Sequence, residues 1–447
     1  MHVKRSILGV GVTLVAGALV LSGCAGAGAG NTSGGKTTLT LATVNNPQMK
    51  DMEELKGEFE KKYPDISVKF IQMEENDLRD AVTKDVATKG GQYDIVTVGA
   101  YEVPIWAKNG WLSDLTQATS SKSYDVNDLF PPVRAGLTSG GKLYAVPFYG
   151  ESSFLMYNKD IFAKAGLTMP ERPTWDQVAT MARQLKTPTQ DGICLRGKPG
   201  WGELFAPLTT VVKTFGGNWY DSKWNATVDD AKFSAASQFY VNLVRDAGEA
   251  DPVSFGFTEC LNNFSQGKSA MWVDATSAAG SVEDPKASPV AGKVGYARSP
   301  VKETKESGWL WSWNLAIPAT SKKKDAAETF VKWATSKDYQ KLVGQKLGWS
   351  RVPPGARTST YSIPQYQKAA SAFAPITKQI MESVDPKNPG VEPQPYTGIQ
   401  FVSIPEFQDI GNQVSQDMAE VFAGRSQLAP VLAKGQKLAQ AAGDKQK

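Results

Sequence analysis

Residues 93–100, YDIVTVGA, form a short apolar run that ends in two small residues. Such a run is typical of a β-strand buried on both faces. Upstream, residues 38–46 (TLTLATVNN) and 64–73 (PDISVKFIQM) also have strand composition, while 49–62 and 76–90 have the apolar spacing of helices. The order strand, helix, strand, helix, strand is typical of a parallel sheet covered by helices, so the sequence predicts an α/β fold.

Polar residues follow each of these predicted strands. In open α/β sheets, ligands bind beyond the carboxyl ends of the strands. We therefore expect one edge of the sheet to carry a group of candidate ligand-binding residues, namely Asn45, Asn46, Glu75, Asn76 and Tyr101.

The N-terminus has the features of an exported lipoprotein. Residues 1–23 combine positive charge at Lys4 and Arg5 with an apolar run too short for a membrane span, which is typical of a signal peptide. The run ends in Leu-Ser-Gly before Cys24 and resembles a bacterial lipobox; the alternative is a signal peptide with an incidental cysteine. Residues 24–37 are small and polar and predict a flexible tether. We expect an extracytoplasmic protein that a lipid anchors to the outer face of the bacterial cell membrane.

Composition excludes several classes of function. The chain has 447 residues, enough for two domains, and a net charge of only +4 without a basic stripe, which argues against nucleic acid as a partner. Its single histidine is His2, within the predicted signal peptide. Histidine-dependent nucleophilic and zinc sites are therefore excluded from the mature protein. No phosphate-binding loop is present, and we expect neither a metal nor a cofactor.

Two cysteines remain after Cys24, at Cys194 and Cys260. An exported protein meets oxidising surroundings, so the two could form a disulfide. Two separate buried thiols are the alternative.

The stretch GWLWSWNLAIP, residues 308–318, places Trp309, Trp311 and Trp313 at alternate positions. Alternate side chains of a strand share one face. These indoles either pack in a core or form an apolar platform for a ligand.

Four motifs in this order resemble the extracellular solute-binding proteins of ABC importers, in the carbohydrate group that includes the maltose-binding protein. They are YDIVTVGAYEVPIWAKNGWLSDL, YAVPFYGESSFLMYNKDIFAKAGL, QGKSAMWVDAT and LAIPATSKKKDAAETFVKWATS. The segments GAYEVPIW, FYGESS, CLRGKPGWGE, MWVDAT and RVPPGARTS are similar to the sorbitol/mannitol (polyol) binding members. The segment TVGAY lacks the tryptophan that maltodextrin binders have there, which favours a smaller ligand.

The resemblance implies a two-lobed periplasmic-binding-protein fold (type II-like), with the ligand in a cleft between lobes joined by a multi-strand hinge. It places chain crossings near residues 148, 313 and 354. We expect residues 38–148 plus 314–354 in the first lobe, and 149–313 plus 355–447 in the second. It also implies a monomer that delivers a polyol or small sugar to the permease subunits of an ABC importer.

The resemblance extends to further candidate site residues. Sugars and polyols present hydroxyls around an apolar carbon surface, which suits indole faces combined with carboxylate acceptors. Glu151 matches the position after the first crossing strand, and Asp274 the end of a second-lobe strand. The remaining candidates are Trp201, Glu203, Arg351 and the three tryptophans Trp309, Trp311 and Trp313.

Two other classes of function remain open at this stage. A carboxylate-dependent glycoside hydrolase would use Glu151 and Asp274 as acid and base. A peptide or amino-acid receptor would need a charged clamp for backbone termini, which an aromatic-rich cleft fits poorly.

Overall fold

The computed structural model describes residues 35–447, and Lys36–Lys447 form one compact unit. The predicted signal peptide and lipobox lie outside the described residues. Thr37, the last residue of the expected tether, is already the first residue of strand β1. Within the described part of the chain, none of the helices has the length and apolar character needed to cross a membrane.

A five-stranded sheet forms the centre of what we call the first lobe. Its spatial order is β2-β1-β3-β10-β6. The strands are β1 (Thr37–Val44), β2 (Ile66–Met73), β3 (Ile95–Gly99), β6 (Val146–Glu151) and β10 (Trp311–Ala316). Strand β1 pairs in parallel with β2 and β3, as predicted, whereas β10 runs antiparallel to both β3 and β6. The carboxyl ends of β1, β2 and β3 therefore meet at one edge, because parallel strands end on the same side.

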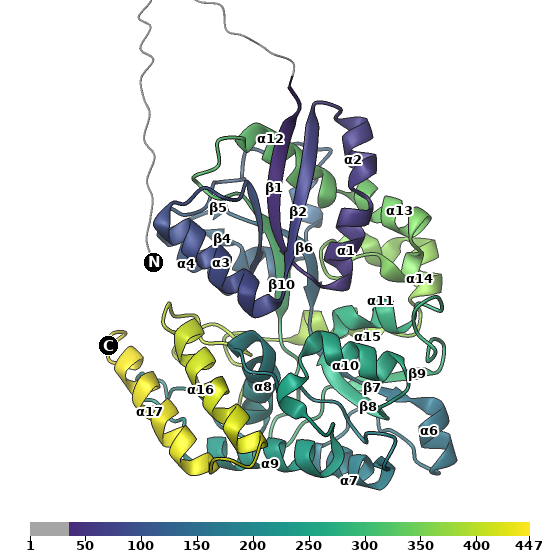
Figure 1. Cartoon of the computed structure of the whole chain (residues 1–447), viewed down its shortest axis with the longest axis vertical. Helices are drawn as coiled ribbons and strands as arrows, with labels where there is room; N and C mark the ends of the chain where they lie inside the picture. The colour runs from purple at the N-terminus through teal and green to yellow at the C-terminus, as the bar shows by residue number, and fades with distance from the viewer. Residues whose placement is uncertain (1–34) are drawn as a thin grey trace, which may run out of the picture. The chain divides into compact units, whose positions relative to one another are not determined.

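Helices cover this sheet. They are α1 (Pro47–Glu54), α2 (Lys56–Lys62), α3 (Glu75–Thr88), α4 (Glu102–Lys108), α5 (Pro131–Gly136), α12 (Lys324–Ala334) and α13 (Lys337–Lys346). The helix expected over 49–62 is divided into α1 and α2 at Leu55. Figure 1 shows α1 and α2 on one side of strands β1 and β2, with α3 and α4 on the other. The short hairpin of β4 (Thr138–Ser139) and β5 (Lys142–Leu143) precedes β6.

The second lobe is built on a three-stranded antiparallel sheet of order β8-β7-β9. Its strands are β7 (Ser153–Asn158), β8 (Met271–Ala275) and β9 (Val294–Arg298). The helices of this lobe are α6 (Lys159–Lys164), α7 (Trp175–Leu185), α8 (Ala206–Thr214), α9 (Ala231–Ala247), α10 (Phe257–Ser265), α11 (Ala279–Val282), α15 (Ala374–Ser383), α16 (Phe407–Phe422) and α17 (Leu428–Gly443). Helices α6, α10 and α15 contact the sheet, whereas α16 and α17 pack on each other and on α9 (Figure 1). The short α14 (Pro364–Ala369) precedes α15.

The strand pairing shows that two of the crossings between the lobes lie at other residues than expected. Strand β6 belongs to the first sheet through Glu151, and β7 of the second sheet begins at Ser153. The first crossing therefore follows residue 151 rather than 148. Likewise, the expected boundary at 313/314 falls inside β10, which pairs with β3 and β6 along its length. The reason is that hydrogen bonding to both neighbours holds the tryptophan strand in the first sheet.

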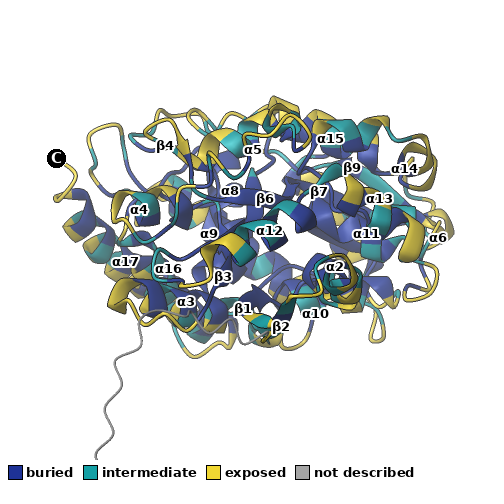
Figure 2. Ribbon diagram, turned by 90° about the horizontal axis from the view of Figure 1, so that it is seen from above, coloured by how far each residue is buried: buried dark blue, intermediate teal, exposed yellow. Residues whose placement is uncertain are grey.

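The core follows the sheets. Leu39, Leu41 and Ile95 of the first sheet and Leu155 and Met271 of the second are completely buried. Figure 2 shows that the buried residues follow the strands and the inward sides of the helices, while the exposed residues lie on loops and outer helix faces. Strand β3 is buried at every residue, which explains why it is an apolar run rather than an alternating pattern, whereas the edge strand β2 is only partly buried.

Candidate functional site

A cavity with an empty volume of about 410 Å³ lies between the tryptophan strand and the second lobe. The lining residues come from both lobes and are Asn46, Glu75, Arg79, Glu151, Arg196, Trp201, Gly202, Ala206, Phe257, Ala275, Trp309, Trp311, Trp313 and Gln400.

The three alternating tryptophans all line this cavity, and each is at most 6% exposed. Trp309 precedes β10, and Trp311 and Trp313 lie on it with ring centroids 5.8 Å apart, edge to face. On the neighbouring strand β6, Glu151 is the partner of Trp311, and Tyr149 is the partner of Trp313. Directly opposed residues share a face of the sheet, so the register places the Glu151 carboxyl beside the indoles.

Gly99 of β3 makes room for this arrangement. A Cβ added at Gly99 would lie 2.2 Å from the ring of Trp311 and 2.6 Å from Glu102 Oε2. Because no side chain projects there, the indole of Trp311 lies directly over the backbone of β3. The glycine in the segment TVGAY is therefore required by the shape of the site.

Arg79 of α3 lies between the carboxylates and the indoles. Its Nε and Nη2 donate to Glu75 Oε1 at 3.0 and 2.8 Å, and its Nη1 donates to Glu102. The guanidinium carbon lies 4.3 Å from the ring centroid of Trp201 and 4.9 Å from that of Trp313, within the range of cation–π contacts. Desolvation on burial lowers the pKa of Arg79, but Glu102 and Glu75 outweigh it, so the pKa is raised. Arg79 is therefore a fixed cation.

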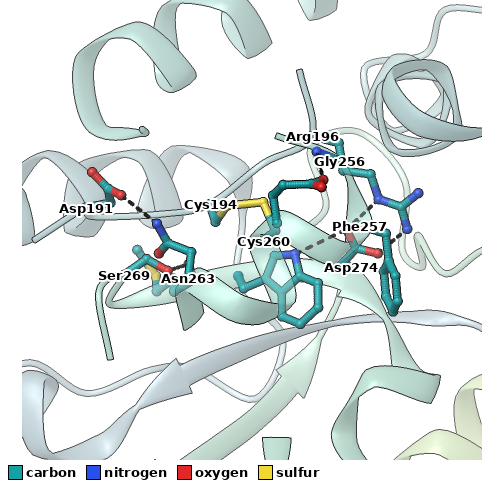
Figure 3. Close-up of a disulfide and its surroundings, with 12 residues drawn as sticks. Asp191, Cys194, Arg196, Gly256, Phe257, Cys260, Asn263, Ser269 and Asp274 are labelled. Atoms are coloured by element: carbon teal, nitrogen blue, oxygen red, sulfur yellow. Dashed lines mark hydrogen bonds and ion pairs between the residues drawn. A yellow bond between two sulfur atoms is a disulfide. The ribbon is translucent and has the colours of Figure 1, made fainter. Parts of the chain in front are cut away.

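Arg196 forms a second guanidinium cluster within the second lobe. Its Nε and Nη2 donate to the two oxygens of Asp274 at 2.8 and 2.5 Å, as Figure 3 shows. Its Nη1 donates to the Gly202 carbonyl at 2.9 Å and to Glu203 Oε2 at 3.4 Å. The indole of Trp272 donates to Asp274 Oδ2 at 3.2 Å. The bidentate geometry fixes the orientation of Arg196, because two parallel hydrogen bonds define the plane of the guanidinium.

A disulfide holds this second cluster in place. Cys194 and Cys260 are bonded, with Cα atoms 5.7 Å apart, so of the two alternatives that the sequence leaves open the structure contains the disulfide. The bond joins the segment that carries Arg196 to helix α10, whose first residue, Phe257, lines the cavity (Figure 3). Among residues 35–447, these cysteines and Glu249 are the one group close enough to hold a metal ion. The disulfide removes both sulfurs from that ligand set, because the thiolate is the ligand form.

Glu151 has an unusual protonation equilibrium. Ser277 donates to its Oε2, and it lies near Arg196, Asp274 and Glu75. Burial raises the pKa of Glu151 to about 8, although the Ser277 hydrogen bond and Arg196 act to lower it. At neutral pH the carboxyl is therefore mostly protonated and can both donate and accept a hydrogen bond.

Three further polar groups in the lining have no hydrogen-bond partner within residues 35–447. They are the indole N–H groups of Trp201 and Trp309 and Oε1 of Gln400. All three residues are at most 3% exposed, and the Gln400 amide is oriented by a bond from Nε2 to the Leu310 carbonyl at 3.1 Å. Since buried polar groups are normally hydrogen-bonded, this lining is suited to a ligand that carries donors and acceptors.

The structure brings seven of the predicted site residues together in the cavity lining: Asn46, Glu75, Glu151, Trp201, Trp309, Trp311 and Trp313. The remaining six lie outside the lining and make other contacts. Asn45 donates to Glu74 Oε1 at 2.5 Å, and Asn76 donates to the Pro199 carbonyl at 2.9 Å. Arg351 pairs with Asp51.

Tyr101, Glu203 and Asp274 support lining residues instead of lining the cavity themselves. The hydroxyl of Tyr101 donates to the Ile404 carbonyl at 2.6 Å, and its ring packs on Trp201 with centroids 5.0 Å apart. Asp274 and Glu203 hold Arg196. Burial raises the pKa of Glu203 to about 7, against the opposing effect of Arg196.

Sequence reasoning missed seven residues of the lining: Arg79, Arg196, Gly202, Ala206, Phe257, Ala275 and Gln400. Arg79 follows Glu75 by one helical turn, a spacing at which side chains on a helix meet. That spacing was a usable signal for Arg79, as was the position of Arg196 within CLRGKPGWGE. Phe257 and Gln400 have no signal in the sequence, because long connections bring them to the cavity.

The family model for bacterial extracellular solute-binding proteins matches residues 44–341. The chain belongs to this family. The mannitol-binding protein of Pseudomonas aeruginosa is 45% identical over 405 residues, covering 90% of this chain and 92% of that protein.

Solved structures agree with this assignment. An ABC transporter solute-binding protein from Agrobacterium vitis with bound D-mannitol is 51% identical, with a TM-score of 0.90, over 92% of this chain and 99% of that one. A solute-binding protein from Agrobacterium radiobacter in complex with ribitol is 25% identical, with a TM-score of 0.81, over 91% and 99% of the two chains. These likenesses confirm the predicted α/β solute-binding fold with two lobes.

Proposed function

We propose that this chain captures an acyclic polyol, of the size of a hexitol such as mannitol, and delivers it to the permease of an ABC importer. The observation that carries the proposal is the cavity lining, which combines four indoles with buried carboxyl groups and unpartnered polar atoms. A polyol offers hydroxyls to the polar atoms and a C–H surface to the indole faces.

The relatives support a small polyol over a longer saccharide. The relatives with 45% and 51% identity are described as binding mannitol or as holding D-mannitol.

The geometry favours binding over glycoside hydrolysis. The alternative mechanism needs Glu151 and Asp274 as a free acid and base facing a common substrate. Both oxygens of Asp274 accept hydrogen bonds from Arg196, one of them also from the Ala275 backbone at 2.6 Å. Asp274 is completely buried and is not part of the cavity lining, so it is a structural partner of Arg196.

The proposed function is consistent with the location expected from the sequence. We propose that Cys24 carries the lipid and that the protein acts as a monomer at the outer face of the cell membrane. The variant Cys24→Ser should release the protein into the medium or leave an unprocessed precursor. Normal processing and membrane retention of this variant would contradict the lipid anchor.

Contacts between the lobes support a closed arrangement around the ligand. Lys198 of the second lobe pairs with Glu74 of the first at 3.2 Å. Gln48 donates to the Ser277 carbonyl at 2.9 Å, and Asn76 makes its bond to residue 199 across the same boundary. We propose that ligand stabilises this arrangement by a hinge motion.

A thermal-shift and calorimetry screen tests the proposed function. D-mannitol, D-glucitol, ribitol, maltose and amino acids are compared with the purified mature protein. A specific ligand at a hundredfold excess over Kd stabilises the folded state by about 2.7 kcal/mol. We expect hexitols to give the largest shift. Stabilisation by maltose or amino acids, but by none of the polyols, would contradict the proposal.

A further inference from the structure

The acidic and basic groups around the cavity are unequal in number. Two guanidinium groups, those of Arg79 and Arg196, stand against five carboxyl groups, which belong to Glu75, Glu102, Glu151, Glu203 and Asp274. The three nitrogens of each guanidinium all donate to protein acceptors. The positive charge is therefore already matched inside the protein, and an anionic ligand would find no free cation there.

The carboxyl groups that line the cavity use fewer of their atoms in hydrogen bonds than the guanidinium groups do. In the described chain, Glu75 accepts hydrogen bonds only through Oε1, and Glu151 only through Oε2. Each lines the cavity and keeps its other oxygen without a protein partner. Glu75 approaches the second lobe closely, since a Cβ added at Gly202 would lie 1.9 Å from Glu75 Oε1. The two carboxyl groups therefore face the cavity from the first lobe and are not displaced toward solvent.

We propose that this cavity selects by charge, so that it binds amino-alditols, acyclic polyols in which a terminal hydroxyl is replaced by an ammonium group, and rejects sugar acids and polyol phosphates of the same length. The inference rests on the proposed polyol function and extends its ligand class. An ammonium group has three donors and a positive charge, which match the free oxygens of Glu75 and Glu151. The carbon chain of such a ligand meets the same indoles as a neutral polyol.

Two further facts support this selection. Burial raises the pKa of Glu151 to about 8, so its carboxyl is neutral beside a neutral polyol and can lose its proton to solvent when an ammonium arrives. A cation loses hydration on entering the cavity, and pairing with a buried carboxylate offsets that loss. An incoming carboxylate or phosphate would lose its hydration without such an offset, because the guanidinium groups of Arg79 and Arg196 already donate to protein acceptors.

The test is a calorimetric titration of the mature protein at pH 7 with D-glucitol, 1-amino-1-deoxy-D-glucitol and D-gluconate. The three probes share a six-carbon chain and differ in charge at one end. We expect the amine to bind within about tenfold of D-glucitol, and gluconate to bind at least a hundredfold more weakly than D-glucitol. Amine binding as weak as that of gluconate, in a protein that binds D-glucitol, would overturn the inference. Failure of every neutral hexitol to bind would instead overturn the proposed function, and the inference with it.

Variants of the cavity carboxyl groups test which residues select the ligand by charge. Glu75→Gln and Glu151→Gln each remove a carboxyl group, and we expect the amine to lose about tenfold relative to D-glucitol, because a charged hydrogen bond becomes a neutral one. Glu303→Gln, which removes one negative charge outside the cavity, should leave the ratio unchanged. The measured quantity is the ratio of amine affinity to polyol affinity. A variant that binds both ligands more weakly to the same extent leaves this ratio unchanged. An unchanged ratio in both cavity variants would contradict the assignment.

Discussion

Two buried arginines flank the cavity, and they are equally buried, each 5% exposed. Arg196 is bound by Asp274, which belongs to the same lobe, and the disulfide lies two residues from it along the chain. Arg79 is bound by Glu75 and Glu102 of the first lobe, but its guanidinium also lies against Trp201 of the second.

The difference separates a preformed part of the site from a part that depends on the lobes meeting. The Arg196 cluster is complete within the second lobe and does not need closure. The contact between Arg79 and Trp201 exists only while the lobes lie together, so its energy contributes to closure and to ligand affinity. Substitutions in the Arg196 cluster should therefore change stability, and substitutions in the Arg79 cluster should mainly change binding.

Asp274→Ala should have the largest effect. It leaves the buried guanidinium of Arg196 without its bidentate partner, and loss of one member of a buried ion pair costs about 3–5 kcal/mol in the free energy of unfolding. Urea denaturation of the unliganded protein measures this. Asp176→Ala is the matched control, because its pair with Lys302 is exposed and should contribute at most about 1 kcal/mol. Equal losses in the two variants would show that the Arg196 cluster is not a special element of stability.

Removal of the disulfide in the double variant Cys194→Ser/Cys260→Ser should lower the free energy of unfolding by about 2–4 kcal/mol. The bond closes a separation of 66 residues in sequence, so it restricts the unfolded chain strongly. We measure the melting temperature with and without a reducing agent. The reductant should lower the melting temperature of the parent protein and leave that of the double variant unchanged. A melting temperature in the double variant equal to that of the oxidised parent would show that the disulfide does not contribute to stability.

Arg79→Met should reduce polyol affinity by about 1–3 kcal/mol, as for other buried contacts at the centre of a binding site. Methionine keeps much of the side-chain volume but removes the charge that faces Trp201. Because the carboxyl of Glu102 can take up a proton, unliganded stability should fall by less than in Asp274→Ala. Calorimetry and urea denaturation of the same preparation separate the two quantities. A loss of stability without any loss of affinity would break the distinction between the clusters.

The effect that is smallest per pH unit concerns Glu151, which lies near both clusters. Its pKa is raised from 4.5 to about 8 by burial, with Asp274 and Glu75 adding to the rise and Arg196 and Ser277 opposing it. The folded protein therefore holds a proton that the unfolded chain loses above pH 4.5. Stability of the parent protein should fall between about pH 4.5 and 8 relative to Glu151→Gln, by at most about 1.4 kcal/mol between pH 6 and 7.

Urea denaturation of both proteins across this pH range checks the sign. The Glu151→Gln variant lacks the titrating group, so the pH-dependent contributions of groups remote from Glu151 cancel in the difference. A difference that stays constant from pH 5 to 8, or that changes in the opposite direction, would contradict a raised pKa for Glu151 in the folded protein.

Much of the fold was predictable from local pattern. The parallel order of β1, β2 and β3 follows from apolar runs that alternate with amphipathic helices. Such an order is predictable because it depends on periodicity and on short separations along the chain. The sequence left open both the bond between Cys194 and Cys260 and the roles of Trp309, Trp311 and Trp313.

The roles of the charged residues were less predictable. Asp274 was expected to contact ligand, yet Arg196 takes up both of its oxygens. Tyr101 was expected at the cavity and instead packs behind Trp201. A carboxylate has the same identity in the sequence whether it meets a ligand or an arginine, and the choice depends on which cation lies within hydrogen-bond distance.

The sequence by itself therefore determined the α/β class, the family and the aromatic character of the site. Only the tertiary structure decided which carboxyl groups keep an oxygen for the ligand. The physical reason is that strand order is encoded by residues close together in the chain, whereas the partner of a buried charge is set by long-range contacts. Arg196 and Asp274 are 78 residues apart in sequence, yet Arg196 Nε lies 2.8 Å from Asp274 Oδ2.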